Sequence, residues 1–133
     1  MNKLLIIEPD IIAGKNLADF LNHQDFNCQV VTTAQKAIEA IDIFRPDMII
    51  LEVQLSVHSG IEFLYELRSY DDIKDCPVII YTMLKKDAWG LGFVNLKLQL
   101  KISQYLCKLD NDFFDLTKEI KSFFKNNLNN AIS

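Results

Sequence analysis

Five short, mostly apolar runs recur along the chain, and polar residues or prolines separate them. They lie at residues 4–7, 28–31, 48–53, 78–82 and 102–107. Runs of this length, rich in Ile, Val and Leu, are typical of strands that are buried on both faces of a sheet. The pattern therefore predicts five strands.

Between these runs, apolar residues recur at the three- and four-residue spacing of amphipathic helices. One such helix is predicted at 11–22, where Asp10 is well placed to cap the N-terminus. A second helix opens after Thr32 or Thr33 and ends at Pro46, because proline disfavours helix continuation. The remaining helices are predicted at 60–67, from near Phe93 in a segment that contains two glycines, and from Asp110 to about Leu128.

Strands that alternate with helices indicate an α/β protein whose parallel sheet is covered on both faces. The common solution at this length is a doubly wound five-stranded sheet of flavodoxin-like order 2-1-3-4-5 with five helices. We assign residues 1–128 to this domain. The Asn-rich residues 129–133 are predicted to be a polar tail or the start of a linker.

Polar residues stand at the carboxyl ends of four of the predicted strands. In a doubly wound sheet these ends meet at the cleft where ligands bind. The residues concerned are Glu8, Pro9 and Asp10 after the first strand, Glu52 at the end of the third, Thr82 at the end of the fourth and Lys108 after the fifth. We expect them to converge on one pocket.

Composition narrows the classes of function. The net charge of −4 does not favour a nucleic-acid or membrane surface, and no apolar run approaches the roughly 20 residues that span a bilayer. Cys28, Cys76 and Cys107 are too far apart to predict a zinc site or a disulfide framework, which favours a reducing cytoplasm. His58 beside Ser59 does not predict catalysis, since no orienting acid is evident.

These features resemble the receiver domain of two-component response regulators over essentially the whole chain. The stretch PDMIILEVQLSVHSGIEFLYELR is similar to the family's segment around its phosphoacceptor, CPVIIYT to its fourth strand and QYLCK to its fifth. In that family two adjacent acids follow the first strand, an aspartate that accepts phosphate ends the third, and a lysine follows the fifth. The resemblance puts Thr82 at the family's hydroxyl position, Lys108 at its lysine and Tyr105 at the aromatic that follows the hydroxyl when phosphate draws it inward.

The chemical positions of the family differ here. Pro9 replaces the second acid and cannot bind Mg²⁺ through its side chain, while Asp10, one residue further on, is expected to cap a helix. Glu52 replaces the phosphoacceptor and carries its carboxylate roughly 1.5 Å further, where a displacement of ~1 Å can cost about 100-fold in rate. Ser56 and Leu109 stand where the family usually has prolines. We therefore expect no metal, no cofactor and no enzymatic activity.

The sequence thus predicts an atypical receiver that acts as a phosphorylation-independent signalling and protein-interaction module. Glu52 stays negative and reaches further than aspartate, as a phosphorylated aspartate does, and Lys108 is placed to pair with it. The pair either fixes one signalling state or is a leftover ion pair that only maintains the fold. The alternative is a still-active phosphoacceptor with an unusual Mg²⁺ site made by Glu8 and Asp10. A flavodoxin-like cofactor binder is disfavoured, because no glycine-rich loop follows the first strand.

Partner binding is expected at the surface that the family uses, made by the fourth helix, the fifth strand and the fifth helix. The domain would pair with itself as a homodimer or dock a protein partner there, without direct contact to nucleic acid. The segment between residues 82 and 108 is about one helical turn longer than is usual in the family. Its Trp89, Phe93 and Leu96 are expected to fold back into the core, and the alternative is an exposed docking patch.

Overall fold

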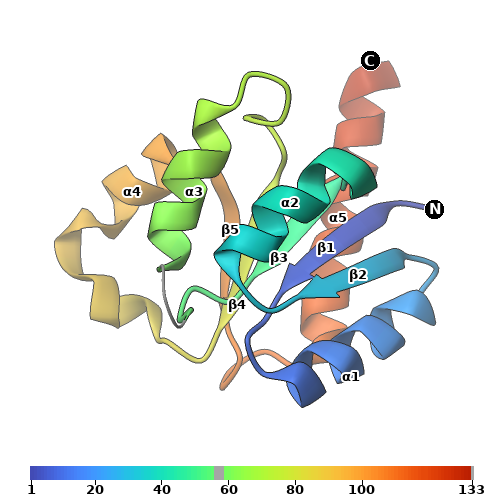
Figure 1. Ribbon diagram of the computed structural model, residues 1–133, viewed down its shortest axis with the longest axis horizontal. Coiled ribbons are helices and arrows are strands. Elements are labelled where there is room, and N and C mark those ends of the chain that lie inside the picture. Colours follow the sequence, from blue (N-terminus) through green and yellow to red (C-terminus); the bar gives the residue numbers. More distant parts are fainter. Residues whose placement is uncertain (56–58, 133) are drawn as a thin grey trace.

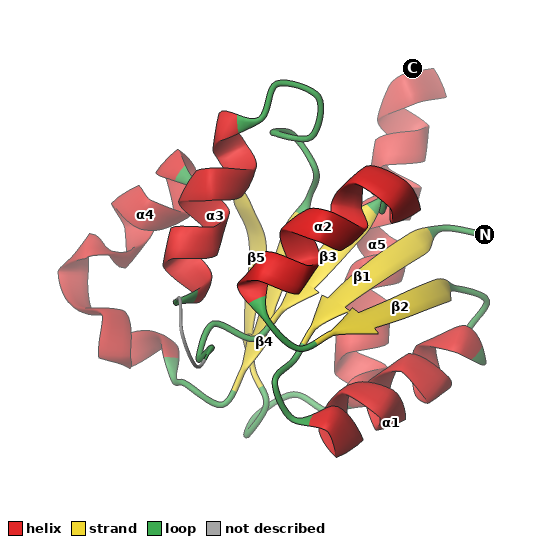
Figure 2. Cartoon of the chain, in the orientation of Figure 1, coloured by secondary structure: helices red, strands yellow, loops and turns green. Residues whose placement is uncertain are grey.

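The computed structural model describes residues 1–55 and 59–132, so Ser56 and His58 lie outside the described residues. One five-stranded parallel sheet, of order β2-β1-β3-β4-β5, carries helices on both faces (Figures 1 and 2). Its strands are β1 (Lys3–Ile7), β2 (Asn27–Val31), β3 (Met48–Leu51), β4 (Val78–Thr82) and β5 (Ile102–Cys107). The helices are α1 (Ile11–Asn22), α2 (Ala34–Phe44), α3 (Gly60–Ser69), the 3-10 segment η1 (Lys86–Gly92), α4 (Phe93–Gln99) and α5 (Phe113–Ile132). The predicted flavodoxin-like fold is confirmed.

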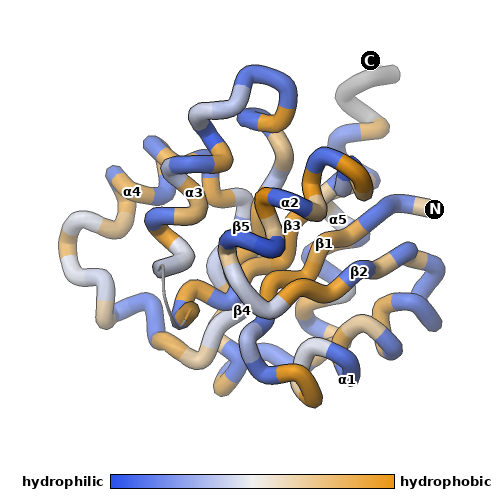
Figure 3. The backbone as a smooth tube through the Cα atoms, viewed as in Figure 1, coloured by the Kyte–Doolittle hydropathy of each residue, from blue (hydrophilic) through white to orange (hydrophobic). Residues whose placement is uncertain are grey.

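Alternating residues of the central strands build two hydrophobic cores, one on each face of the sheet. In β1, Leu5 and Ile7 face one core with residues of α2 and α3, whereas Leu4 and Ile6 face the other with residues of α1 and α5. Figure 3 shows the hydrophobic residues concentrated along these strands. Because both faces are covered, the strands are nearly continuous apolar runs, which is why the sequence reveals them.

Side-chain caps fix where the helices begin. The Asp10 carboxylate accepts hydrogen bonds from the main-chain N–H groups of Ile12 and Ala13, both at 3.0 Å, so its predicted capping role is confirmed. Of the two candidates before α2, Thr33 is the cap, and its hydroxyl accepts from the main-chain N–H of Lys36 at 3.1 Å. These caps start α1 and α2 directly after the carboxyl ends of β1 and β2.

Several element boundaries differ from the prediction, among them the end of β3, the end of α3 at Ser69 and both ends of α5. Strand β3 ends at Leu51, two residues before the predicted end, so Glu52 is the first residue beyond it. Helix α5 starts at Phe113 rather than near Asp110, because Asp112 and Asp115 exchange main-chain-to-carboxylate hydrogen bonds of 2.9 and 3.0 Å that define its first turn. The backbone of α5 continues through residues 129–132.

Arg68 joins the ends of several elements near the start of β4. Its guanidinium donates hydrogen bonds of 2.6 to 3.1 Å to four main-chain carbonyls, those of Lys74, Cys76, Leu100 and Lys101. A planar group with five donors suits this task, whereas an ammonium does not. Arg68 therefore connects α3 to the loop before β4 and to the turn after α4.

Candidate functional site

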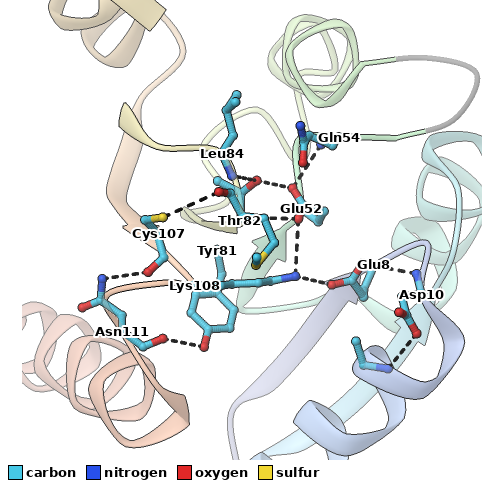
Figure 4. A network of polar contacts seen from close by, with 12 residues as sticks. Glu8, Asp10, Glu52, Gln54, Tyr81, Thr82, Leu84, Cys107, Lys108 and Asn111 are labelled. Carbon is cyan, nitrogen blue, oxygen red and sulfur yellow. Dashed lines mark hydrogen bonds and ion pairs between the residues drawn. The ribbon is translucent and has the colours of Figure 1, made fainter. Parts of the chain in front are cut away.

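A buried ion cluster lies at the carboxyl ends of the central strands (Figure 4). The ammonium of Lys108, which follows β5, is in hydrogen-bond contact with Glu8 Oε1 and lies 3.3 Å from Glu52 Oε1. Glu8 follows β1 and Glu52 follows β3, and they are only 7% and 6% exposed. The expected pairing of Lys108 with Glu52 is present, but Glu8 is the nearer partner. The cluster carries two negative charges and one positive charge.

Both carboxylate oxygens of Glu52 are occupied by donors. Oε2 accepts from the Thr82 hydroxyl and, at 3.1 Å, from the main-chain N–H of Gln54. Oε1 accepts from the main-chain N–H of Met83 and from the Lys108 ammonium, both at 3.3 Å. A carboxylate offers about four acceptor positions, so this one is close to saturated. Most of the hydrogen-bonding capacity of this buried carboxylate is therefore satisfied within the pocket.

The residues after β1 do not fit a magnesium site. The ion needs about six oxygen ligands in near-octahedral geometry. Glu8 Oε1 contacts Lys108, its Oε2 accepts from the main-chain N–H of Asp10 at 3.2 Å, and the Asp10 carboxylate caps α1. Pro9 offers no side-chain ligand. Among residues 1–55 and 59–132, no group of three His, Cys, Asp or Glu side chains is placed to hold a metal ion.

The hydroxyl groups of Thr82 and Tyr105 are both held by hydrogen bonds. The Thr82 hydroxyl, fully buried, donates to Glu52 and accepts from the main-chain N–H of Leu84 at 3.3 Å. The Tyr105 hydroxyl donates to the Leu84 carbonyl at 2.6 Å and accepts from the indole N–H of Trp89 at 2.8 Å. Burial raises the pKa of Tyr105, so its hydroxyl is a neutral donor near pH 7. Tyr105 is half-buried, and its ring packs against the core.

Tyr81 is a member of the pocket that the sequence did not reveal. Its ring centroid lies 5.6 Å from the Lys108 ammonium, and its hydroxyl donates to the Asn111 carbonyl at 2.8 Å. The cavity between Tyr81, Lys108, Glu8 and Glu52 measures only about 10 Å³, at the lower limit of what a single water molecule needs. The main-chain donors of Gln54 and Met83 were also missed, since any residue type can supply an N–H there.

The longer segment between β4 and β5 folds partly inward and partly outward. Phe93 is buried, and Trp89 and Leu96 pack against the core, which confirms the expectation for these three side chains. Helix α4 starts at Phe93, as predicted. The large apolar residues exposed on η1 and α4 are Leu91, Val94 and Leu98, hereafter the apolar stripe, which the sequence did not distinguish from their buried neighbours.

A parallel sheet of order 2-1-3-4-5 with two acids, a threonine and a lysine at its carboxyl edge defines a receiver-type signalling domain. Residues 4–120 match the family model of the response regulator receiver domain, so the chain belongs to this family. No helix in the described part of the chain has the length and apolar character needed to cross a membrane.

Individual relatives agree with this assignment. Among curated proteins, the transcriptional regulatory protein CrdR of Helicobacter pylori is 26% identical over 122 residues, covering 92% of this chain and 54% of CrdR. A protein-glutamate methylesterase/protein-glutamine glutaminase of Clostridium acetobutylicum is 24% identical, covering 96% of this chain and 38% of that protein. The chain thus spans about half or less of the length of these two relatives.

Solved structures show the same fold. A sensor protein from Polaromonas sp. JS666 superposes with a TM-score of 0.83 at 18% identity, covering 94% of this chain and 97% of that chain. A two-component response regulator from Clostridium difficile gives a TM-score of 0.80 at 23% identity with the same coverage.

Proposed function

We propose that this receiver domain signals without phosphorylation, as a cytoplasmic, non-catalytic protein-interaction module in which Glu52 is a permanent negative charge. The observation that carries the proposal is the set of four donors around the Glu52 carboxylate: a hydroxyl, two main-chain N–H groups and an ammonium. A carboxylate with both oxygens so occupied is a poor nucleophile towards a phosphoryl group. Phosphoryl transfer depends on positioning and charge neutralisation, and among the described residues the pocket offers neither a free oxygen on Glu52 nor a set of side chains that fits a metal ion.

The position of the Thr82 hydroxyl supports the proposal that Glu52 acts as a permanent negative charge. In the family that the chain belongs to, phosphate draws this hydroxyl inward and the switch aromatic follows. Here the hydroxyl is bonded to Glu52 and Tyr105 lies inward, bonded to the Leu84 carbonyl. We infer that Glu52 substitutes for a phosphorylated aspartate and holds one signalling state.

The surface of α4, β5 and α5 is where we place the partner, either a second copy of this domain or another protein. The exposed apolar stripe supports this, since Val94 and Leu98 of α4 and Leu91 just before it expose apolar side chains to water. Direct nucleic-acid binding by this domain is not part of the proposal, because the net charge is −4. Sedimentation of the wild type and of Leu98→Glu would test self-pairing.

Amide NMR titration with Mg²⁺ and then beryllofluoride tests the proposal directly. Beryllofluoride is a stand-in for the phosphoryl group. We expect no shift of the Glu8, Glu52, Thr82 and Lys108 amides in the wild type.

The matched control is Pro9→Asp/Glu52→Asp, which restores both carboxylates of the family pattern and is expected to gain Mg²⁺-dependent shifts. If the wild type binds Mg²⁺ and beryllofluoride then moves Tyr105, the domain is an active phosphoacceptor and the proposal is wrong.

A further inference from the structure

Trp89, a residue of η1, holds the hydroxyl of Tyr105. The indole N–H of Trp89 donates to the Tyr105 hydroxyl at 2.8 Å, and the two rings are nearly perpendicular, at 87° with centroids 6.2 Å apart. The Phe93 ring contacts Tyr105 edge-on at 5.2 Å. Perpendicular aromatic pairs add to the hydrogen bond and restrict ring rotation. The Tyr105 side chain therefore contacts both η1 and α4.

A continuous series of hydrogen bonds connects this contact with Glu52. Glu52 accepts from the Thr82 hydroxyl, and that hydroxyl accepts from the main-chain N–H of Leu84 at 3.3 Å. The carbonyl of Leu84 then accepts from Tyr105, which accepts from Trp89. Figure 4 shows the first part of this series. Leu84 thus makes one hydrogen bond to Thr82 through its N–H and one to Tyr105 through its carbonyl, so a single residue separates the two hydroxyl groups.

Gly90 turns the chain outward directly after Trp89. Its φ of 68° and ψ of −157° lie in a region that is almost restricted to glycine, and a Cβ there would strain the backbone. On one side of this kink Trp89 packs against the core, and on the other side Leu91 is fully exposed. Val94 and Leu98 follow at spacings of three and four residues, which place them on the same side of α4. The kink therefore links the position of Trp89 to the position of the apolar stripe.

We propose that Trp89 is a positioning residue that conveys the state of position 52 to η1 and α4, and so sets how the apolar stripe is presented. This inference rests on the proposed function, since it requires that the Glu52 carboxylate holds Thr82. The inference goes beyond the proposed function, because it assigns the coupling between position 52 and α4 to Trp89, a residue of the longer segment between β4 and β5. Trp89 is the single tryptophan of the chain, so its fluorescence and its indole proton report on this contact alone.

Indole N–H exchange measured by NMR, with tryptophan emission, tests the coupling in variants that remain folded by their amide spectra. Glu52→Ala and Thr82→Val interrupt the series, and we expect both to increase indole exchange about 5-fold or more, the lower end of typical coupling energies. Tyr105→Phe removes the acceptor of the indole while retaining the ring, and is expected to have the same effect. In all three variants the emission of Trp89 should move to the red, and the α4 amides should exchange faster.

Two controls separate coupling from a general loss of stability. Glu8→Gln changes a buried carboxylate of the same cluster that touches neither Thr82 nor Leu84, and Thr82→Ser keeps the hydroxyl. Neither variant is expected to change indole exchange. If Thr82→Val leaves Trp89 unchanged while Tyr105→Phe frees it, Trp89 holds Tyr105 without any connection to the pocket and the inference is wrong. The two experiments fail separately. Binding of beryllofluoride to the wild type would overturn the proposed function, whereas the result with Thr82→Val decides only whether Trp89 is coupled to the pocket.

Discussion

Replacing Lys108 by methionine removes the cation from the buried ion cluster while keeping most of the apolar stem over the Tyr81 ring. Glu8 and Glu52 are then two buried negative charges without their ammonium. At an effective dielectric constant of about 20, a pair at this distance contributes about 5 kcal/mol before the desolvation of lysine is subtracted. Removing one partner of a buried pair typically costs about 3–5 kcal/mol. Since Lys108 is 19% exposed and both carboxylates have other donors, we expect a loss of about 3 kcal/mol in the free energy of unfolding.

Urea denaturation followed by far-ultraviolet circular dichroism measures this loss. For a domain of this size the midpoint should fall by roughly 1.5 to 2 M urea, without a change in the slope of the transition. The matched control is Lys101→Met, which removes the ion pair between Lys101 and Asp75 at 2.8 Å. Those side chains are 60% and 73% exposed, so water already screens the pair and the midpoint should hardly move.

A second variant tests the cause of the loss. In Lys108→Met, adding Glu8→Gln removes one of the two unpaired charges, and more than half of the lost stability should return. Two outcomes would refute this reasoning: Lys108→Met unfolds at the same urea concentration as the wild type, or Glu8→Gln destabilises it further. In either case charge compensation does not hold the cluster together, and another interaction must stabilise the pocket.

Three further predictions concern positions away from the cluster. Arg68→Lys keeps the charge but loses the planar fork that reaches four carbonyls, and should lower the free energy of unfolding by about 2 kcal/mol in urea titration. Gly60→Ala would put a Cβ 2.6 Å from the Cα of Val53 and should cost about 1–3 kcal/mol, whereas Gly92→Ala meets nothing within 4 Å and should be neutral. Burial raises the pKa of Tyr81 to about 12, so its neutral form stabilises the fold fully below pH 10 and this stabilisation is lost as the pH rises towards 12. Tyr81→Phe should therefore flatten the alkaline loss of stability measured by circular dichroism.

The fold could be predicted from the sequence because both of its signals are local. Strands buried on both faces have continuous apolar sequences, and helices have apolar residues at every third or fourth position. The ends of the helices and strands were harder to predict from the sequence. The start of α5 depends on the reciprocal hydrogen bonds of Asp112 and Asp115, and several nearby acids, Asp110 among them, could have made the cap. Strand β3 ends at Leu51 although Val53 is apolar and buried, so the apolar run continues beyond the strand.

The pocket could be predicted only in part, because several of its contacts depend on side-chain torsions and on main-chain groups. Glu8, Glu52, Thr82 and Lys108 could be grouped from sequence, since parallel strands bring their carboxyl ends to one edge. Which carboxylate Lys108 approaches more closely depends on side-chain torsions, and no residue pattern encodes these. The main-chain donors to Glu52 come from the backbone and leave no mark in the sequence. The bond between Trp89 and Tyr105 spans sixteen residues across a kink at Gly90, so no local pattern could reveal it.

Charge and reach at position 52 can be separated, and this distinguishes a fixed signalling state from a leftover ion pair. Glu52→Gln keeps the length of the side chain and an acceptor for the Thr82 hydroxyl but loses the charge that faces Lys108. Glu52→Asp keeps the charge but withdraws the carboxylate by roughly 1.5 Å. This shift lengthens the donor–acceptor distances to Thr82 and the other donors beyond the range of a hydrogen bond. If the residue serves only the fold, Glu52→Gln should cost more stability than Glu52→Asp, and neither should alter the exchange of the Trp89 indole. If it fixes a signalling state through Thr82, Glu52→Asp should free the indole and Glu52→Gln should retain it, whichever variant is the more stable. Faster indole exchange in Glu52→Asp but not in Glu52→Gln would therefore identify reach as the property that signals, and unchanged exchange in both variants would leave Glu52 as a structural ion pair.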